Sequence, residues 1–370
     1  MVFELLGKHG GHEEVVFCHN QDVGLKAIIA IHNTALGPAL GGTRMWNYQT
    51  DEEALVDVLR LSQGMTYKAA AAGLNLGGGK AVIIGDPKTQ KTEGLFRAFG
   101  TFVNSLNGKY ITAEDVGTTV KDMEYVYMET PWVTGIPKAF GGSGDPSPYT
   151  AHGVLMGIQA AAKERLGVDS LEGLRIAVQG LGSVGSHLVG YLHKEKAHIT
   201  VADIDPEKVR YIADRYNAKS VDPREIVTSD CDILAPCALG GVIHDQVIDQ
   251  LKCTIVAGGA NNQLAEARHG ESLKQLNILY APDYVINAGG LMNVFVELEG
   301  YSSARAFDKT REVYNNLMRV FKMAKEQNIS TNIAADRVAL ARIQTIGRLK
   351  QSHQGRTSRL FTTLREVNNR

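Results

Sequence analysis

The hydrophobic pattern of the first part of the chain predicts a sheet covered by helices. Short β-rich runs separated by turn residues are typical of strands, and apolar residues at helical spacing follow Thr50 and Glu53, the two positions of a capping box. That helix is expected to end near Gly73. The predicted strands are 14–20, 26–33, 41–46, 81–85 and 109–119, with a further helix at 95–106.

Strands alternate with amphipathic helices in the second part of the chain, which is typical of a parallel sheet with right-handed crossovers. A helix is expected from Thr150, and residues 174–205 have the pattern strand, glycine turn, helix, strand. Further strands are predicted at 231–238, 253–261 and 278–287, before a helical C-terminal third and a polar tail.

The segment 135–148, rich in Gly, Pro and Ser, is expected to link two domains. A length of 370 residues also exceeds what one hydrophobic core usually supports. The sequence therefore predicts an α/β fold of two domains, residues 1–134 and residues 135–339, with a cleft between them.

Composition excludes several classes of protein. Hydrophobic residues make up 44% of the chain and charged residues 21%, as in a globular protein, and a net charge of -1 argues against a nucleic-acid partner. The first residues lack the basic flank of a secretory signal, and no apolar run reaches the roughly 18 residues of a membrane span, so a cytoplasmic protein is expected. The cysteines form no CxxC pair, so neither a disulfide framework nor a metal site is expected.

The strongest local motif is GLGSVG, which follows the predicted strand RIAVQ and opens a helix. Asp203 ends the next strand, where its carboxylate could accept both adenosine ribose hydroxyls of a dinucleotide. The glycines would make a tight turn and admit a pyrophosphate to the helix N-terminus, whereas the alternative is an ordinary structural turn. Asp203 and Asp205 would repel a 2′-phosphate, so NAD is expected rather than NADP. The motif residues are Gly180, Leu181, Gly182, Ser183, Val184 and Gly185.

Three consecutive glycines, 77–79, precede Lys80 and an apolar strand. The phosphate-loop pattern does not fit, because Leu74 and Ala81 stand where it needs a glycine and a hydroxyl residue. Glycines lack a β-carbon and would let the backbone approach a ligand closely. Lys80 would then enter a desolvated site, in which a lysine can serve as a general base or acid near pH 7.

Two more side chains could carry chemistry, although Lys68 could equally be a surface cation and Asp115 a helix cap. The blocks MTYKAAAAGLNLGGGKAVIIGDP, YITAEDVGTT, APCALGG, GGANNQL and APDYVINAGGLMN resemble the amino-acid dehydrogenase family of glutamate, leucine, valine and phenylalanine enzymes. The resemblance extends over nearly the whole chain and is closest to the leucine-acting members. It implies a substrate and oligomerisation domain, a Rossmann-type dinucleotide domain, and a tail at about 340–370 that packs on the first domain.

The resemblance also implies roles for single residues. Lys80 matches the catalytic lysine that activates a water for attack on an imino acid, and Asp115 matches the group that moves the amino proton. Lys68 matches the residue that holds the substrate α-carboxylate by a charge-assisted contact, and Asn262 lies near that carboxylate. On the cofactor side the matching residues are Thr150 and Asn287 at the nicotinamide amide, and Ala238 and Asn261 along the dinucleotide.

The substrate pocket implied by the resemblance is apolar. A lysine stands at the position of Leu40 in the glutamate enzymes, so an acidic side chain would lose hydration here without gaining a partner. Ala113 leaves less room than the glycine of phenylalanine-type enzymes, which favours a branched aliphatic side chain, whereas Leu291, Met292 and the segment GIPKAFGGSGD depart from the leucine type. The expected pocket residues are Leu40, Gly41, Met65, Ala113, Leu291 and Val294.

The implied function is reversible NAD-dependent deamination of L-leucine and other branched-chain amino acids to 2-oxo acids, ammonium and NADH. A homo-oligomer, an octamer by resemblance, and domain closure over the substrate are expected. Valine-preferring or aromatic-preferring activity of the same family is an alternative. A hydroxy-acid dehydrogenase would need a histidine base, and His32, His152 and His244 lack such a context. A non-catalytic NAD-binding protein would have no reason to carry both lysines with an aspartate.

Overall fold

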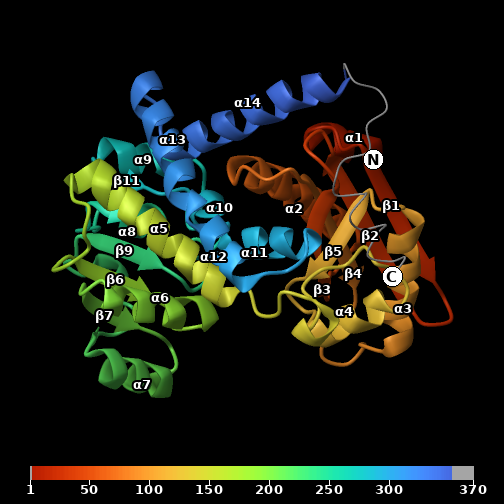
Figure 1. Ribbon diagram of the computed structural model, residues 1–370, viewed down its shortest axis with the longest axis horizontal. Coiled ribbons are helices and arrows are strands. Elements are labelled where there is room, and N and C mark those ends of the chain that lie inside the picture. Colours follow the sequence, from red (N-terminus) through yellow and green to blue (C-terminus); the bar gives the residue numbers. More distant parts are fainter. Residues whose placement is uncertain (1, 352–370) are drawn as a thin grey trace. The chain divides into compact units, whose positions relative to one another are not determined.

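The computed structural model describes residues 2–351, which form two compact units (Figure 1). Of the described residues, the first unit comprises 2–145, 294–303 and 339–351, and the second comprises 146–293 and 304–338. Each unit has its own sheet with helices on it, so the predicted two-domain α/β fold is confirmed.

The first unit continues to Asp145, beyond the predicted domain boundary after residue 134. The reason lies in Glu297, whose carboxylate accepts hydrogen bonds from the backbone amides of Gly135, at 3.1 Å, and Ser143, at 2.8 Å. These bonds hold the predicted linker to the first unit. Residues 352–370 of the predicted C-terminal tail lie outside the described residues.

One mixed sheet, in the order β1-β2-β4-β3-β5, forms the centre of the first unit. β1 pairs antiparallel with β2 and β2 with β4, whereas β3 lies parallel between β4 and β5. The prediction that the fourth strand starts at 81 is wrong, because the glycines before it already pair with both neighbouring strands. The strands are β1 (Glu14–Asn20), β2 (Leu25–Asn33), β3 (Ala39–Trp46), β4 (Gly77–Ile84) and β5 (Tyr110–Glu114).

Helices cover both faces of this sheet. α2 packs Leu55 and Val58 against Ile28 and Val82 on one face, and α3 contacts β1, β2 and β5. The Thr50 hydroxyl accepts from the amide of Glu53, as predicted, but the Glu53 carboxylate bonds the amide of Gln49, so the capping box is only half formed. The helices are α1 (Val2–Lys8), α2 (Asp51–Ala71), α3 (Glu93–Ser105), α4 (Val120–Tyr127) and α14 (Thr331–Gln351), the last from Ala339 onward.

The glycines of β4 make room for the protein itself. A Cβ on Gly78 would overlap the backbone nitrogen of Thr66 in α2, and a Cβ on Gly79 would lie 2.7 Å from the ring of Tyr110. At both positions the space that a side chain would occupy is filled by the protein itself and is not left open to a ligand. The absence of side chains instead lets α2 lie directly on the strand that carries Lys80.

Six parallel strands form the sheet of the second unit, in the order β11-β10-β9-β6-β7-β8. This is the strand order of doubly wound dinucleotide-binding sheets, so the predicted Rossmann-type architecture is confirmed. The predicted strand 278–287 stops at Tyr280, because Pro282 has no amide proton to donate and a helix starts at Asp283. The strands are β6 (Arg175–Gln179), β7 (His198–Ala202), β8 (Lys219–Ser220), β9 (Ile233–Pro236), β10 (Ile255–Val256) and β11 (Leu279–Tyr280).

Helices also cover both faces of the second sheet. α5 and α6 contact β10 and β6, while Ile226, Ile248 and Leu273 pack on the other face against Ala177 and neighbouring strand residues. The helices are α5 (Ser147–Leu166), α6 (Ser183–Lys194), α7 (Pro206–Tyr216), α8 (Asp245–Ile248), α9 (His269–Gln275), α10 (Asp283–Ile286), α12 (Ser303–Thr310) and α13 (Glu312–Gln327), together with α11 (Gly289–Leu298), which passes into the first unit at Val294. α5 thus starts three residues before the predicted Thr150.

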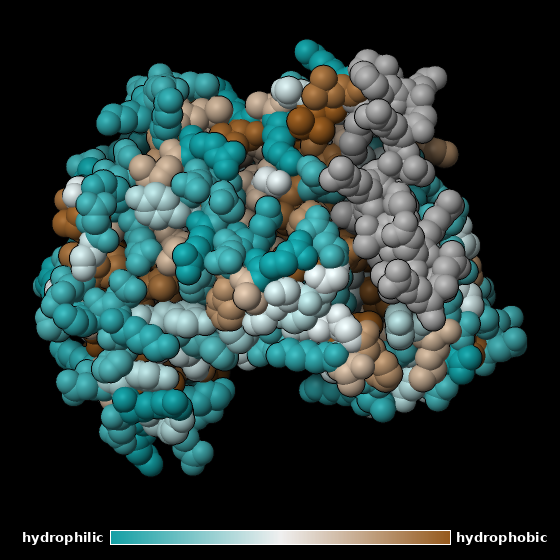
Figure 2. Space-filling view, in the orientation of Figure 1, coloured by the Kyte–Doolittle hydropathy of each residue, from teal (hydrophilic) through white to brown (hydrophobic). Residues whose placement is uncertain are grey.

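The surface of the described residues is largely hydrophilic on the face shown in Figure 2. Two strongly exposed apolar side chains are Ile204, at 92%, and Leu239, at 86%. Ile204 follows Asp203 and Leu239 follows Ala238, two residues that the sequence analysis assigned to cofactor binding. Within residues 2–351, no helix combines the length and the apolar character needed to cross a membrane.

Candidate active site

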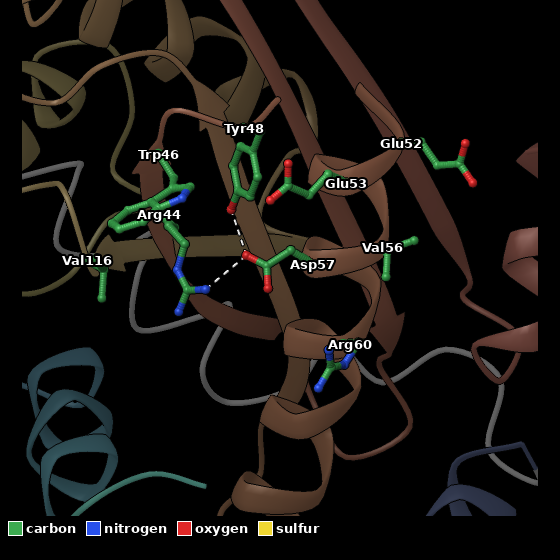
Figure 3. A pocket seen from close by; sticks show the side chains of 9 residues that line it. All are labelled: Arg44, Trp46, Tyr48, Glu52, Glu53, Val56, Asp57, Arg60 and Val116. Atoms are coloured by element: carbon green, nitrogen blue, oxygen red, sulfur yellow. Dashed lines mark hydrogen bonds and ion pairs between the residues drawn. The ribbon is translucent and has the colours of Figure 1, made fainter. Parts of the chain in front are cut away.

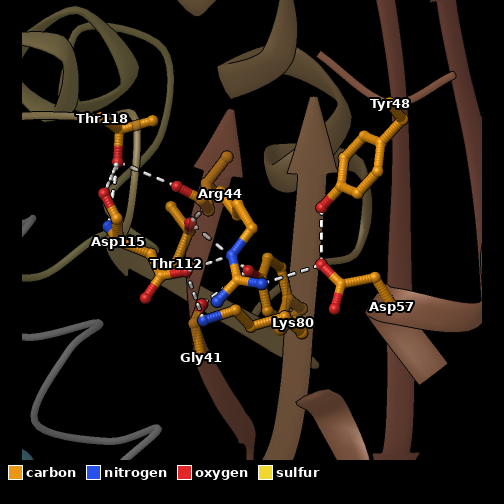
Figure 4. A network of polar contacts seen from close by, with 10 residues as sticks. Gly41, Arg44, Tyr48, Asp57, Lys80, Thr112, Asp115 and Thr118 are labelled. Atoms are coloured by element: carbon orange, nitrogen blue, oxygen red, sulfur yellow. Dashed lines mark hydrogen bonds and ion pairs between the residues drawn. The ribbon is translucent and has the colours of Figure 1, made fainter. Parts of the chain in front are cut away.

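Lys80 and Asp115 form a half-buried ion pair in the first unit (Figure 4). Lys80 is held in the interior of β4, with only 6% of its side chain exposed, and its Nζ lies 3.0 Å from Oδ2 of Asp115. Asp115 directly follows β5, and 24% of its side chain is exposed. The two residues that the sequence analysis proposed as acid and base are therefore in contact, although β3 separates β4 from β5 in the sheet.

Local structure fixes the position of Asp115. Its backbone amide donates to the hydroxyl of Thr118 at 2.9 Å, and that hydroxyl donates to the carbonyl of Thr43 in β3 at 2.8 Å. Gly42 lies beside β5, and a Cβ there would come 2.9 Å from the Cβ of Asp115. A larger residue at position 42 would therefore displace the carboxylate from Lys80.

Three residues that the sequence analysis did not single out extend this network. Arg44 Nε lies 3.1 Å from Oδ2 of Asp115, and its Nη1 lies 2.9 Å from Oδ2 of Asp57. The hydroxyl of Tyr48 donates to the same Asp57 oxygen at 2.6 Å. The available signal for Arg44 was a charged residue within the strand ALGGTRMW, whose other residues except Trp46 are buried.

The two cations determine the ionisation of Asp115. Burial acts to raise the pKa of its carboxyl group, but the charge of Lys80, then that of Arg44, and the hydrogen bonds of both outweigh burial and hold this pKa below its ordinary value. The carboxylate is therefore ionised at neutral pH, as a proton acceptor must be.

The other predicted substrate residues of the first unit occupy neighbouring elements. Lys68 is half-buried in α2, three residues after Met65. Leu40 is 3% exposed and pairs with Gly78, and Ala113 is 8% exposed and pairs with Gly42 of the same strand β3. Leu40, Gly41, Met65, Ala113 and Val294 belong to the first unit, and Leu291 and Asn262 to the second.

A cavity of about 580 Å³ that is open to solvent also lies in the first unit (Figure 3). Arg44 lines the cavity and also pairs with Asp115, so it connects the cavity to the Lys80–Asp115 pair. Lys80 and Asp115 themselves do not line the cavity. None of the predicted substrate residues lines it. Its walls are formed by Arg44, Trp46, Tyr48, Glu52, Glu53, Val56, Asp57, Arg60 and Val116.

The glycine turn of the second unit has the geometry of a dinucleotide site. Gly180 has a positive φ of 92°, which favours glycine, and a Cβ there would lie 2.8 Å from the nitrogen of Ala238. A Cβ on Gly185 would overlap the carbonyl of Gly180, so only glycine lets α6 pack this closely. Gly182, the N-cap of α6, has open space beside it, and the N-terminus of a helix is a general binding place for anions.

Asp203 is oriented by the turn itself. Its Oδ2 accepts from the amide of Leu181 at 2.5 Å, and its Oδ1 accepts from the amide of Asp205 at 2.9 Å. The carboxylate of Asp205 has other partners: it caps α7 and lies 3.5 Å from Nζ of Lys208. The carboxylate of Asp203 is thus held at the glycine turn, whereas that of Asp205 caps a helix.

Further predicted cofactor residues gather in the same unit. Asn287 donates to the side-chain oxygen of Asn261 at 2.7 Å, so the structure brings these two amides together. Asn262 follows in the left-handed conformation, with a φ of 52°. Thr150 lies in the first turn of α5, and its hydroxyl bonds the carbonyl of Pro146.

Comparison with known proteins finds a family model for each of the two parts of the chain. Residues 12–132 match the family described as "Glu/Leu/Phe/Val dehydrogenase, dimerisation domain", and residues 141–206 and 201–356 match "Glutamate/Leucine/Phenylalanine/Valine dehydrogenase". The first match contains Lys80 and Asp115, and the second contains the glycine turn and Asp203.

Individual relatives cover nearly the whole chain. Leucine dehydrogenase of Geobacillus stearothermophilus is 59% identical over 90% of this chain and 91% of its own, and phenylalanine dehydrogenase of Caldalkalibacillus thermarum is 49% identical over 91% and 93%. The crystal structure of L-tryptophan dehydrogenase from Nostoc punctiforme matches with a TM-score of 0.85 and 46% identity, covering 94% of this chain and 99% of that one. The chain therefore belongs to the Glu/Leu/Phe/Val dehydrogenase family and is an amino-acid dehydrogenase.

Proposed function

We propose that this enzyme catalyses the reversible NAD-dependent oxidative deamination of L-leucine and other branched-chain L-amino acids. In this reaction the amino acid, NAD and water give a 2-oxo acid, ammonium, NADH and a proton. The observation that carries the proposal is the half-buried Lys80–Asp115 pair in a chain that is 59% identical to a leucine dehydrogenase.

The residues of the second unit fit a dinucleotide. The open space beside Gly182 and the N-terminus of α6 would hold the pyrophosphate, and Asp203 would accept the adenosine ribose hydroxyls. The exposed side chains of Ile204 and Leu239 offer apolar surface for the adenine ring. Asn287 and Thr150 would bind the carboxamide. When bound, NAD accepts the hydride that leaves the substrate Cα.

The first unit supplies charge and proton transfer. Lys68 would hold the substrate α-carboxylate, which leaves the amino group to Asp115. The ionised Asp115 accepts a proton from the substrate ammonium, and the resulting amine becomes an iminium ion as the hydride leaves Cα. Lys80 accepts a proton from the water that attacks the iminium carbon. Asp115 returns its proton to the nitrogen, which leaves as ammonium as the carbonyl forms, and the proton on Lys80 is the one that the overall reaction releases. The ion pair between them keeps both groups at the reacting atoms.

The apolar character of Leu40 and Ala113 supports a branched aliphatic substrate. Both are almost fully buried in adjacent strands of one sheet, so an acidic substrate side chain would lose its hydration there. A preference for aromatic amino acids is the second candidate, supported by the tryptophan and phenylalanine dehydrogenases among the relatives and by Leu291. Valine and leucine differ by one methylene, worth about 1 to 3 kcal/mol, so these residues do not fix the order of preference between the two.

The chain carries the dimerisation domain of its family, so it belongs with self-associating enzymes. We propose an octamer as its assembly and the cytoplasm as its location. Support for both comes from the family resemblance.

The test of the proposal is the initial rate of NAD reduction with leucine, valine, isoleucine, phenylalanine, tryptophan and glutamate, repeated with NADP. We expect the highest kcat/KM with leucine or valine and NAD, because Asp203 repels a 2′-phosphate. Faster turnover of the aromatic amino acids would overturn the substrate assignment and leave the chemistry of Lys80 intact. Equal rates with NADP would overturn the role of Asp203.

A further inference from the structure

Arg44 stands between two carboxylates that belong to different elements. Its Nε lies 3.1 Å from Asp115, next to β5, and its Nη1 lies 2.9 Å from Asp57 in α2. Its own side chain is 23% exposed, similar to the 25% of Asp57. One guanidinium thus connects the reactive carboxylate with a helix that has no part in the proposed proton transfer (Figure 4).

The geometry requires an arginine at this position. A guanidinium presents several donors in a fixed plane, so it can meet two carboxylates at once, while an ammonium is a point charge on a flexible stem. The charges also balance, because two cations, Lys80 and Arg44, face two anions, Asp115 and Asp57. Tyr48 adds a neutral donor to Asp57 at 2.6 Å and so fixes the carboxylate that receives Arg44.

We propose that Arg44 is a positioning residue for the reaction: its guanidinium holds the Asp115 carboxylate against Lys80, and Asp57 and Tyr48 hold the guanidinium. Both Lys80 and Arg44 contact Oδ2 of Asp115, so the second oxygen, Oδ1, can meet the substrate nitrogen. The inference deepens the proposed function, because it depends on Asp115 as the proton acceptor.

Loss of Arg44 has a defined electrostatic consequence. An opposite charge within about 4 to 6 Å lowers a carboxyl pKa by about 1 to 3 units, so removal of the guanidinium raises the pKa of Asp115. Asp115 must be ionised to accept a proton, and activity will therefore be lost at a higher pH than in the wild type. The titratable and charged groups around Asp115 are Lys80 of β4, Arg44 of β3, Glu114 and Tyr110 of β5, Asp57 of α2, and Tyr48.

The cavity of about 580 Å³ makes a direct test possible, because Arg44 lines it and it is open to solvent (Figure 3). A small cation can enter through this space once the arginine side chain is removed. Guanidinium and ethylguanidinium carry the planar fork of the lost side chain, and urea is a neutral molecule of the same shape.

The experiment uses the full-length Arg44→Ala enzyme and measures kcat and KM between pH 6 and pH 11, with and without millimolar guanidinium, ethylguanidinium or urea. We expect kcat to fall by about 10² or more, with the acid limb of the pH profile moved up by about 1 unit or more. Either guanidinium ion should restore at least part of kcat and return the limb toward its wild-type position. Urea should do neither.

Two matched variants separate charge from geometry. Arg44→Lys keeps the charge, so the acid limb should stay near the wild-type position while kcat falls, because an ammonium cannot meet both carboxylates. Arg60→Met removes a cation from the wall of the same cavity and should leave the profile unchanged. An unshifted limb in Arg44→Ala, or rescue by urea as strong as by guanidinium, would overturn the proposal and leave Arg44 a purely structural residue.

The substrate for these profiles is whichever amino acid the wild-type enzyme turns over fastest. The outcome then rests on the ratio of kcat between variant and wild type and not on a preference for leucine. A wrong substrate assignment shows in the wild-type panel alone, whereas a wrong role for Arg44 shows only in the variants.

Discussion

Lys80 combines burial with an ion pair, a combination that is uncommon for a lysine and costly unless the charge is compensated. Asp115 compensates the charge of Lys80, and the same carboxylate also pairs with Arg44. The sequence identified Lys80 and Asp115 through motifs, but it gave no sign of their 3.0 Å contact. That contact depends on the pairing of β3 with both β4 and β5, strands that are distant along the chain.

Substitution of Lys80 tests what this single residue contributes to the reaction. Lys80→Met keeps the apolar stem and removes the ammonium, so kcat for deamination should fall by about 10² to 10⁴. Measurement of NAD reduction at saturating substrate, beside NADH affinity by fluorescence titration, checks this prediction. Lys26→Met, at an exposed position of the neighbouring strand β2, is the matched control and should retain wild-type kcat. Unimpaired turnover in Lys80→Met would remove Lys80 from the mechanism.

At the scale of elements, hydrophobic periodicity predicts that a helix or strand exists better than it predicts where that element begins and ends. The strands of the first sheet and the strand, turn and helix around the glycine motif occur where the pattern indicates, because their apolar sets are buried on the sheet. The glycines of β4 carry no apolar signal, so the pattern missed the beginning of that strand. Their role depends on what lies beside them, namely Thr66 of α2 and Tyr110 of β5, and such contacts cannot be read from local sequence.

Gly78→Ala tests this packing. The new methyl group would overlap the backbone of α2 at Thr66, and overpacking of a dense core costs about 1 to 3 kcal/mol or more, so a lower Tm is expected. The matched control is Gly64→Ala in α2, where a Cβ meets nothing within 4 Å and alanine is the better helix former by about 1 kcal/mol. Its Tm should rise slightly. Equal thermal denaturation curves for the two variants would contradict the packing role of Gly78.

At the scale of the whole molecule, the chain divides its chemistry between two units with separate sheets. The residues proposed for proton transfer lie in the first unit, and the glycine turn proposed for the dinucleotide lies in the second. The sequence predicted two domains, but it placed the boundary after residue 134, where composition turns loop-like. It could not show that Glu297, more than 150 residues later, ties the 135–145 segment to the first unit through backbone amides.

This division predicts that cofactor binding and chemistry can be impaired separately. Gly182→Val fills the open space beside the N-terminus of α6, so NADH should bind at least about tenfold more weakly, as expected when a phosphate contact of about 1.4 kcal/mol or more is lost. No neighbouring atom lies within 4 Å of the new Cβ, and Tm should therefore stay close to the wild type. Lys80→Met should show the reverse pattern, with NADH affinity retained and turnover lost. Fluorescence titration of both variants decides the matter: weakened NADH binding in Lys80→Met equal to that in Gly182→Val would mean that the two units do not act independently on the cofactor.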